Sequence, residues 1–185
     1  MMAGLLQMDG EILLWIQDHL RNPILTPFIR AFTSLGNSGL LWILLIIASL
    51  CFHKTRKAGA AGALALIFSL LLVNVWVKPA VDRIRPYEAI EGLTRLIERQ
   101  KDPSFPSGHA SAAFAAAVAF RIYLPQKQLS LGLLILAAFM AFTRLYVGVH
   151  YPTDVLAGIL FGILSALLAY GLLRLVERRR EKRRE

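Results

Sequence analysis

Residues 105–120 read "FPSGHASAAFAAAVAF", a short polar segment followed by a run of alanine, phenylalanine and valine. The run predicts a packed or lipid-facing helix, and Pro106, Ser107, Gly108 and His109 stand at its start. The first N–H groups of a helix lack intrahelical partners and lie at the positive end of its dipole, and glycine lets a ligand approach them. The segment is therefore either an anion site or an ordinary cap made by Ser107, with His109 at the interface.

The composition of the whole chain indicates a membrane protein. The 185 residues are enough for one domain, 56% of them are hydrophobic, and the mean hydropathy is +0.55. The net charge of +9 is concentrated at the C-terminal end, so nucleic acid is not the expected partner. The single cysteine, Cys51, excludes an intrachain disulfide and argues against a cysteine-based metal site.

Apolar runs predict an all-α, polytopic bundle of five to six transmembrane helices, since one span needs about 20 apolar residues. Residues 11–35 precede the secure spans and predict amphipathic helices, interrupted at Pro23, that either lie on the membrane or cross it. A further helical stripe over 87–99 predicts a surface helix, either as a lid or guide for substrate or as a plain interfacial element. The five secure spans are 38–53, 57–78, 108–124, 128–147 and 153–176.

Alternation of the spans sorts their ends onto two sides. The tight loops 54–56 and 125–127 and the basic tail 177–185 fall on one side, and the long loop 79–107 falls on the other. Positive charge beside short loops marks the cytoplasmic side, so we expect the tail inside the cell and the 79–107 loop outside. The tail is also expected to contact anionic membrane lipids.

Three segments bring ionisable and hydroxyl residues together on the predicted outer side, each at the membrane edge of a span. Ionisable side chains are costly at membrane depth and tend to mark functional sites. The first is "KPAVDRIRP" (78–86), the second is the PSGH already quoted, and the third is "TRLYVGVHYPTD" (143–154). Taken singly, each has a plain explanation as snorkelling cations or a helix cap. The residues concerned are Lys78, Arg85, Ser107, His109, Arg144, His150 and Asp154.

Together these side chains suit phosphate chemistry. Arginine binds phosphate oxygens bidentately, one histidine can attack phosphorus, and a second can protonate the leaving oxygen. Asp154, in the first turn after Pro152, would orient His150. A metal site made by His109, His150 and Asp154 is the rival, and we rank it lower because three nearby cations would repel a divalent ion.

The three segments resemble the signature of the type 2 phosphatidic acid phosphatase superfamily, K-x6-R-P, then P-S-G-H, then S-R-x5-H-x3-D. All spacings fit, and Thr143 in place of serine is the one departure. The resemblance implies a metal-independent phosphatase without a cofactor, which works through a phosphohistidine. It implies His150 as nucleophile, Asp154 as its orienting partner and His109 as general acid. It implies phosphate binding by Lys78, Arg85, Ser107, Gly108 and Arg144.

Within that family, the chain resembles bacterial undecaprenyl-diphosphate phosphatases of the cell membrane, whose sites face outward. Phosphatidic acid and phosphatidylglycerophosphate are the alternative substrates. An anion-conducting bundle or a non-catalytic membrane protein that binds anionic lipid is the alternative of another class. Small residues in 110–118 and 157–166 permit close helix packing within or between chains, so the oligomeric state is left open.

Overall fold

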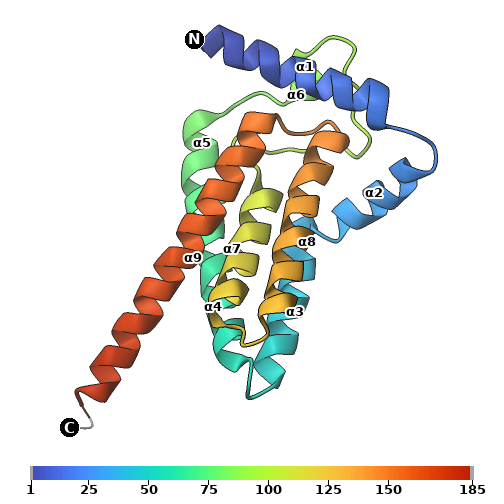
Figure 1. The fold of residues 1–185 in the computed structure, drawn as a ribbon. Helices are drawn as coiled ribbons and strands as arrows, with labels where there is room; N and C mark the ends of the chain where they lie inside the picture. Colours follow the sequence, from blue (N-terminus) through green and yellow to red (C-terminus); the bar gives the residue numbers. More distant parts are fainter. Residues whose placement is uncertain (1, 184–185) are drawn as a thin grey trace.

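The computed structural model describes residues 2–183, and in this part of the chain every regular element is a helix (Figure 1). The predicted all-α class is therefore confirmed for these residues. The helices are α1 (Met2–Leu20), α2 (Leu25–Ser34), η1 (Asn37–Gly39), α3 (Leu40–Cys51), α4 (Arg56–Ser69), η2 (Leu70–Val77), α5 (Lys78–Val81), α6 (Pro86–Ala89), α7 (Gly108–Tyr123), α8 (Lys127–Tyr146) and α9 (Pro152–Glu181).

Three helical segments are long and apolar enough to cross a membrane: Arg56–Ala89, Lys127–Tyr146 and Pro152–Glu181. The pair Leu25–Ser34 and Asn37–Cys51, bent by 55°, adds a fourth if it acts as one span. A bundle with three to four candidate spans is thus present. The larger count of five to six and the amphipathic role of residues 11–35 stay predictions.

Helix α7 is the centre of the bundle and has only 16 residues. It packs against α4, α8 and α9, and most of its alanines are fully buried (Figure 1). Two glycines of α9 allow backbone contact, because a Cβ at Gly158 or Gly162 would lie 2.5 Å from the carbonyl oxygen of Ser107 or Ser111. An enclosed helix of small residues touches protein rather than lipid, so it needs no full bilayer length.

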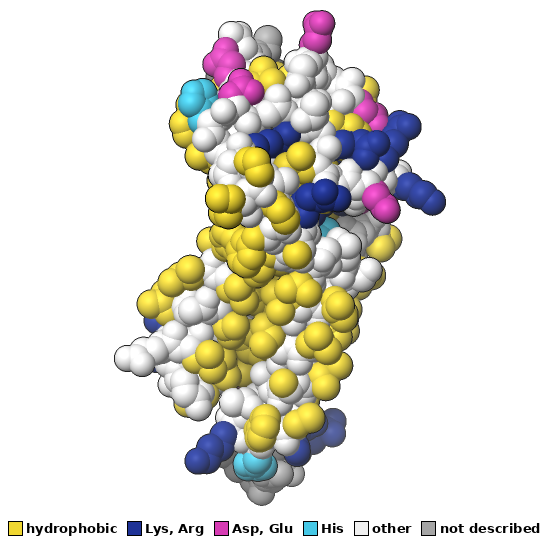
Figure 2. Space-filling view, turned by 90° about the vertical axis from the view of Figure 1, so that its right-hand side faces the viewer, with side chains coloured by type: hydrophobic (Ala, Val, Ile, Leu, Met, Phe, Trp, Pro, Cys, Tyr) yellow, Lys and Arg dark blue, Asp and Glu magenta, His cyan; other side chains and the backbone are white. Residues whose placement is uncertain are grey.

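The face of the molecule in Figure 2 has an apolar band between two ends that carry charged side chains. Large aliphatic side chains on α8 and α9 point outward, and Leu160 and Ile135 are 67% and 64% exposed. Such a surface is unfavourable in water and suits contact with lipid tails. The end of α9, which includes the first residues of the basic tail, extends beyond the other bundle helices (Figure 1). The last two tail residues, Arg184 and Glu185, lie outside the described part of the chain.

At the opposite end, α1 lies across the tops of the bundle helices (Figure 1). Its buried side chains, Leu13 and Ile16, pack against apolar clusters that include residues of the loop between α6 and α7. The predicted helix over 87–99 is wrong, because only Pro86–Ala89 is helical. The helix ends at Ile90, which is extended with a φ of −106° and a ψ of 116°. Beyond it, Gly92 adopts a φ of +79°, which a helix does not allow, and the Leu96 amide donates to the Val147 carbonyl at 3.0 Å.

Candidate active site

A cavity of about 680 Å³ opens beside the N-terminus of α7. One end is polar, and the other is walled by aliphatic side chains of α3, α4 and η2. Six of the eight predicted site residues line it: Lys78, Arg85, Gly108, His109, Arg144 and His150. Ser107 and Asp154 lie directly behind, where the Ser107 amide donates to the Asp154 backbone carbonyl at 3.0 Å.

The segment 78–86, which contains Lys78 and Arg85, follows a π-helix and reaches the cavity from its end. Residues Leu70–Val77 form a π-helix, η2, and Lys78 begins α5 where it ends. π-Helical turns are rare and frequently occur at functional sites. Arg85 is extended, with a ψ of 149°, because the proline that follows it disfavours helical backbone.

Lys78 and Arg85 share one carboxylate, that of Asp102, in the loop between α6 and α7. The Arg85 Nη2 donates to Asp102 Oδ1 at 2.8 Å, and Lys78 Nζ binds the other oxygen, Oδ2. Partial burial alone would raise the pKa of Asp102, but its contacts with Lys78 and the charge of Arg85 lower that pKa to about 2. Asp102 stands outside the three motifs and was not predicted as a site residue.

Arg144 reaches the cavity from the last turn of α8 and is 1% exposed. Its Nη1 donates to the hydroxyl of Thr33 at 2.7 Å, whereas its Nε has no hydrogen-bond partner among residues 2–183. The neighbouring Thr143 hydroxyl lies 3.0 Å from the same Thr33 oxygen and 2.7 Å from the Met140 carbonyl. The residue that departs from the family pattern therefore supports the partner of Arg144 and does not face the cavity.

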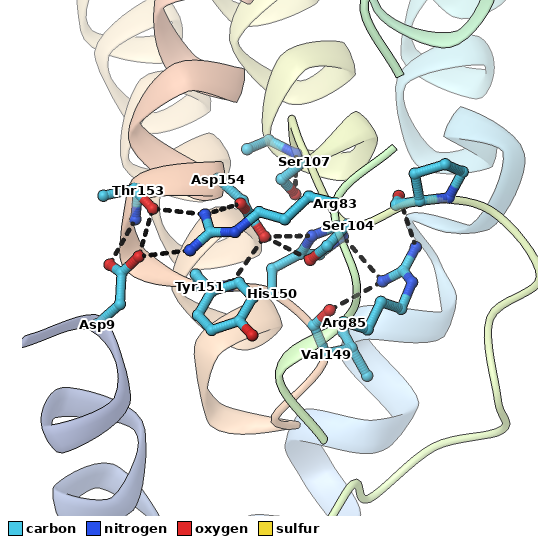
Figure 3. Close-up of polar contacts among 12 residues, drawn as sticks. Asp9, Arg83, Arg85, Ser104, Ser107, Val149, His150, Tyr151, Thr153 and Asp154 are labelled. Atoms are coloured by element: carbon cyan, nitrogen blue, oxygen red, sulfur yellow. Dashed lines mark hydrogen bonds and ion pairs between the residues drawn. The ribbon is translucent and has the colours of Figure 1, made fainter. Parts of the chain in front are cut away.

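His150 lies in the turn between α8 and α9, after Gly148 at a φ of +74° (Figure 3). Its Nε2 is 3.4 Å from Arg85 Nη1, and its Nδ1 is 3.5 Å from Asp154 Oδ2. The latter separation is at the outer limit of a hydrogen bond. The imidazole is 2% exposed, and its Nε2 edge faces the cation-lined end of the cavity.

Asp154 is fully buried in the first turn of α9, as predicted, with Pro152 in that same turn. Its Oδ2 accepts from the Tyr151 amide at 3.0 Å and from the Ser104 hydroxyl at 2.5 Å (Figure 3). Its Oδ1 accepts from Arg83 Nη1 at 2.5 Å. The cap of α9 and the predicted partner of His150 are thus one carboxylate. Three donors hold it, while Nδ1 of His150 lies nearby and makes no hydrogen bond with residues 2–183.

In the PSGH segment the structure confirms the predicted cap, while the anion site stays a prediction. Ser107 is the N-cap of α7, with its hydroxyl 3.5 Å from the Ala110 amide, while Gly108 and His109 line the cavity. The His109 Nε2 lies 3.3 Å from Oδ1 of Asn37, at the break between α2 and α3. Among the described residues, no group of three or more His, Cys, Asp or Glu side chains forms a metal-binding cluster.

Comparison with known proteins adds a family to this geometry. A family model described as "PAP2 superfamily" matches residues 58–178. The undecaprenyl-diphosphatase of Sulfolobus acidocaldarius is 34% identical over 122 residues, which are 66% of this chain and 58% of that protein. This chain therefore spans less than two thirds of that relative.

Two further relatives match over longer stretches. The lipid A 4'-phosphatase of Bacteroides thetaiotaomicron is 29% identical over 182 residues, which cover 92% of this chain and 79% of that protein. The crystal structure of a transmembrane PAP2-type phosphatidylglycerolphosphate phosphatase from Bacillus subtilis superposes with a TM-score of 0.75 at 26% identity. It covers 94% of this chain and 88% of its own.

Proposed function

The chain belongs to the PAP2 superfamily, and from that premise we propose that it is an integral-membrane lipid phosphatase. Residues 1–185 act as a single phosphatase domain, with the catalytic motifs in 78–154. The reaction hydrolyses a phosphate or diphosphate lipid through a phosphohistidine intermediate. It takes place at the outer face of the cell membrane, with the basic tail in the cytoplasm.

One observation carries this proposal: the cavity joins a cation-rich end with two histidines to an aliphatic wall. Lys78, Arg85 and Arg144 line the polar end, where an anion is favoured. Ile43, Leu66, Ile67 and Leu70 are among the side chains of the apolar end. A lipid whose phosphate lies at the first end has its tail beside the second.

The chemistry divides between the two histidines. Nε2 of His150 attacks phosphorus, the bond to the leaving oxygen breaks, and His109 gives that oxygen a proton. A water molecule then attacks the phosphohistidine, His109 takes a proton from the water, and inorganic phosphate leaves with His150 restored. Asp154 stabilises the imidazole as it becomes positive. The three cations stabilise the charge on the phosphoryl oxygens, which supplies most of the catalysis in phosphoryl transfer.

For the substrate, we propose undecaprenyl diphosphate, hydrolysed to undecaprenyl phosphate. The similarity to the S. acidocaldarius undecaprenyl-diphosphatase supports this choice. The relatives named for lipid A and phosphatidylglycerophosphate support a second choice of head group, and phosphatidic acid is a third. The proposed partners are thus the phosphorylated lipid substrate and the surrounding membrane lipids.

The test is release of inorganic phosphate by purified protein in detergent, in the presence of a chelator. Undecaprenyl diphosphate, phosphatidylglycerophosphate, phosphatidic acid and lipid A are compared under the same conditions. We expect undecaprenyl diphosphate to be hydrolysed fastest. We expect His150→Ala to abolish phosphate release. The control is His53→Ala, which should leave release unchanged because His53 is exposed and lies outside the three motifs.

Three outcomes would contradict the proposal in different ways. Release that persists in His150→Ala would refute the phosphohistidine route. Activity that is lost with chelator and restored by one divalent ion would refute metal independence. Binding of these lipids without release from any of them would favour the non-catalytic lipid-binding alternative.

A further inference from the structure

The Asp154 carboxylate is the end of a chain of buried charges that begins on the first helix of the structure (Figure 3). Asp9 on α1 is 3% exposed, Asp154 on α9 is fully buried, and Arg83 lies between them with 17% of its side chain exposed. None of the three motifs includes Asp9, and Arg83 is one of the unspecified positions in the first motif.

The contacts of Arg83 fix it on both sides. Its Nη1 donates to Asp154 Oδ1 at 2.5 Å and to the Thr153 hydroxyl at 2.7 Å, and its Nη2 donates to Asp9 Oδ2 at 2.9 Å. Its guanidinium also lies 3.7 Å from the centroid of the Tyr151 ring. Asp9 in turn accepts from the Thr153 amide at 3.1 Å and from the Thr153 hydroxyl at 2.5 Å.

This arrangement has two consequences for Asp154. Because Arg83 holds Oδ1, the other oxygen, Oδ2, is turned toward His150. Arg83 also places a positive charge beside the Asp154 carboxylate. Alone, this positive charge would cancel the negative charge that stabilises the His150 imidazole as it becomes positive. Asp9 supplies a second negative charge, so the three side chains together carry a net charge of −1. Buried charges interact strongly and are costly unless paired in this way.

We propose that Asp9 is a positioning residue for the reaction: by offsetting the charge of Arg83, it keeps the Asp154 carboxylate effectively anionic toward His150, while the Tyr151 amide and the Ser104 hydroxyl hold Oδ2 in place. Helix α1 is then part of the active site, although it contributes no group that touches the substrate. The inference rests on the roles proposed above for His150 and Asp154.

The test is Asp9→Asn, which keeps the shape and an acceptor for Arg83 but removes the charge. With the fastest of the four lipids named above, we expect kcat to fall about tenfold, with KM changed less than about twofold. The matched control is Asp18→Asn, the same chemical change at an exposed position of the same helix, which should leave both parameters unchanged. Asp9→Glu, which restores the charge, should recover part of the lost kcat.

A double variant separates charge balance from a purely structural role. Adding Arg83→Gln to Asp9→Asn returns the net charge of the cluster to −1. We expect this double variant to regain about threefold in kcat over Asp9→Asn. If Asp9 only helped to hold the fold, removing a second buried contact would lower kcat further, and that result would overturn the inference.

The outcomes also separate this inference from the proposed function. An unchanged kcat in Asp9→Asn, with His150→Ala inactive, would refute the role of Asp9 alone. Persistent activity in His150→Ala would refute the underlying mechanism. If Asp9→Asn alone does not fold, the double variant is compared with the unmodified protein, and a tenfold loss followed by a threefold regain leaves about a third of the original kcat. A kcat below about a tenth of that of the unmodified protein would overturn the inference.

Discussion

Asp102 contacts both Lys78 and Arg85, two of the side chains proposed to bind phosphate. Since these contacts lower its pKa to about 2, the carboxyl is ionised throughout the neutral range. The stabilisation from a carboxylate with a lowered pKa is present above its ordinary pKa and is lost only as the pH falls toward 2. Under the proposed function, a substrate phosphate therefore competes with Asp102 for the same two cations at every working pH.

Removing that competitor should tighten phosphate binding. We expect Asp102→Asn to lower the inhibition constant of inorganic phosphate about threefold to fivefold, because a half-exposed ion pair is worth up to about 1 kcal/mol. The dependence of kcat on pH between about 5 and 8 should keep its shape, because Asp102 does not titrate there. Glu91→Gln, at an exposed site of the same loop, is the control. A rise in the inhibition constant would show that Asp102 organises the cations instead of competing for them.

Individual site residues could be predicted from the sequence where they belong to motifs with a fixed spacing along the chain. The three motifs predicted eight site residues, and the structure places all eight in or directly behind one cavity. Asp102, Arg83 and Asp9 were missed because their partners are remote, with Arg83 separated by 74 positions from Asp9. The available signal was Asp9 itself, a carboxylate inside the apolar run "LLQMDGEILLW". The run also contains Glu11, and without the fold neither acid gives a hint of its partner.

Among the elements, the contact between α7 and α9 gives the sharpest prediction. A Cβ at Gly158 would lie 2.5 Å from the Ser107 carbonyl oxygen, so Gly158→Ala must push the two helices apart. We expect a loss of about 1–3 kcal/mol in stability and a fall in kcat, since Ser107 precedes Gly108 and His109. The measurements are thermal unfolding in detergent and phosphate release.

The control is Gly171→Ala on the same helix, where a Cβ meets no atom within 4 Å. That variant should be as stable as the unmodified protein or slightly more so, because alanine favours helix over glycine. Equal effects of the two substitutions would mean that helix propensity, and not the close contact at Gly158, determines the result.

Helices could be predicted from the sequence where a long apolar run marks them. They could not be predicted where the conformation of the backbone is the deciding feature. The residues Leu70–Val77 form a π-helix, yet their apolar run "LLLVNVWV" reads like any α-helical span. The apolar residues of 87–99 have helical spacing, but two leucines pack in different clusters: Leu93 contacts the cluster of Leu13 on α1, and Leu96 the cluster of Val147 after α8. Periodicity records which side chains are buried and does not record which neighbour buries them.

For the whole molecule, orientation in the membrane is the feature to measure. We expect a membrane-impermeant maleimide to label a single cysteine at position 91 in intact cells, but to label one at position 182 only after lysis. The background is Cys51→Ser, which removes the one natural cysteine. The expectation follows from the basic residues beside the short loops and the tail. Labelling of position 182 from outside would reverse the proposed orientation.

The class of the molecule followed from composition, because a chain with 56% hydrophobic residues in long runs can bury them only in a helical bundle within lipid. The number of spans did not follow, because α7 is enclosed by protein and α2 and α3 are bent by 55° at their junction. Hydropathy measures the apolar character of a segment. It does not tell whether lipid or a neighbouring helix surrounds that segment.

Because of the backbone contact between α7 and α9, one wall of the cavity is more rigid than the other. Gly108 and His109 line the cavity beside this contact, where the glycines of α9 leave no room for adjustment, while α3 and η2 line a softer wall with flexible aliphatic side chains. Under the proposed function, substitutions on the soft wall change which tail fits without disturbing the reacting groups. One framework can thus acquire new lipids in evolution by altering half of its cavity while the other half stays constant.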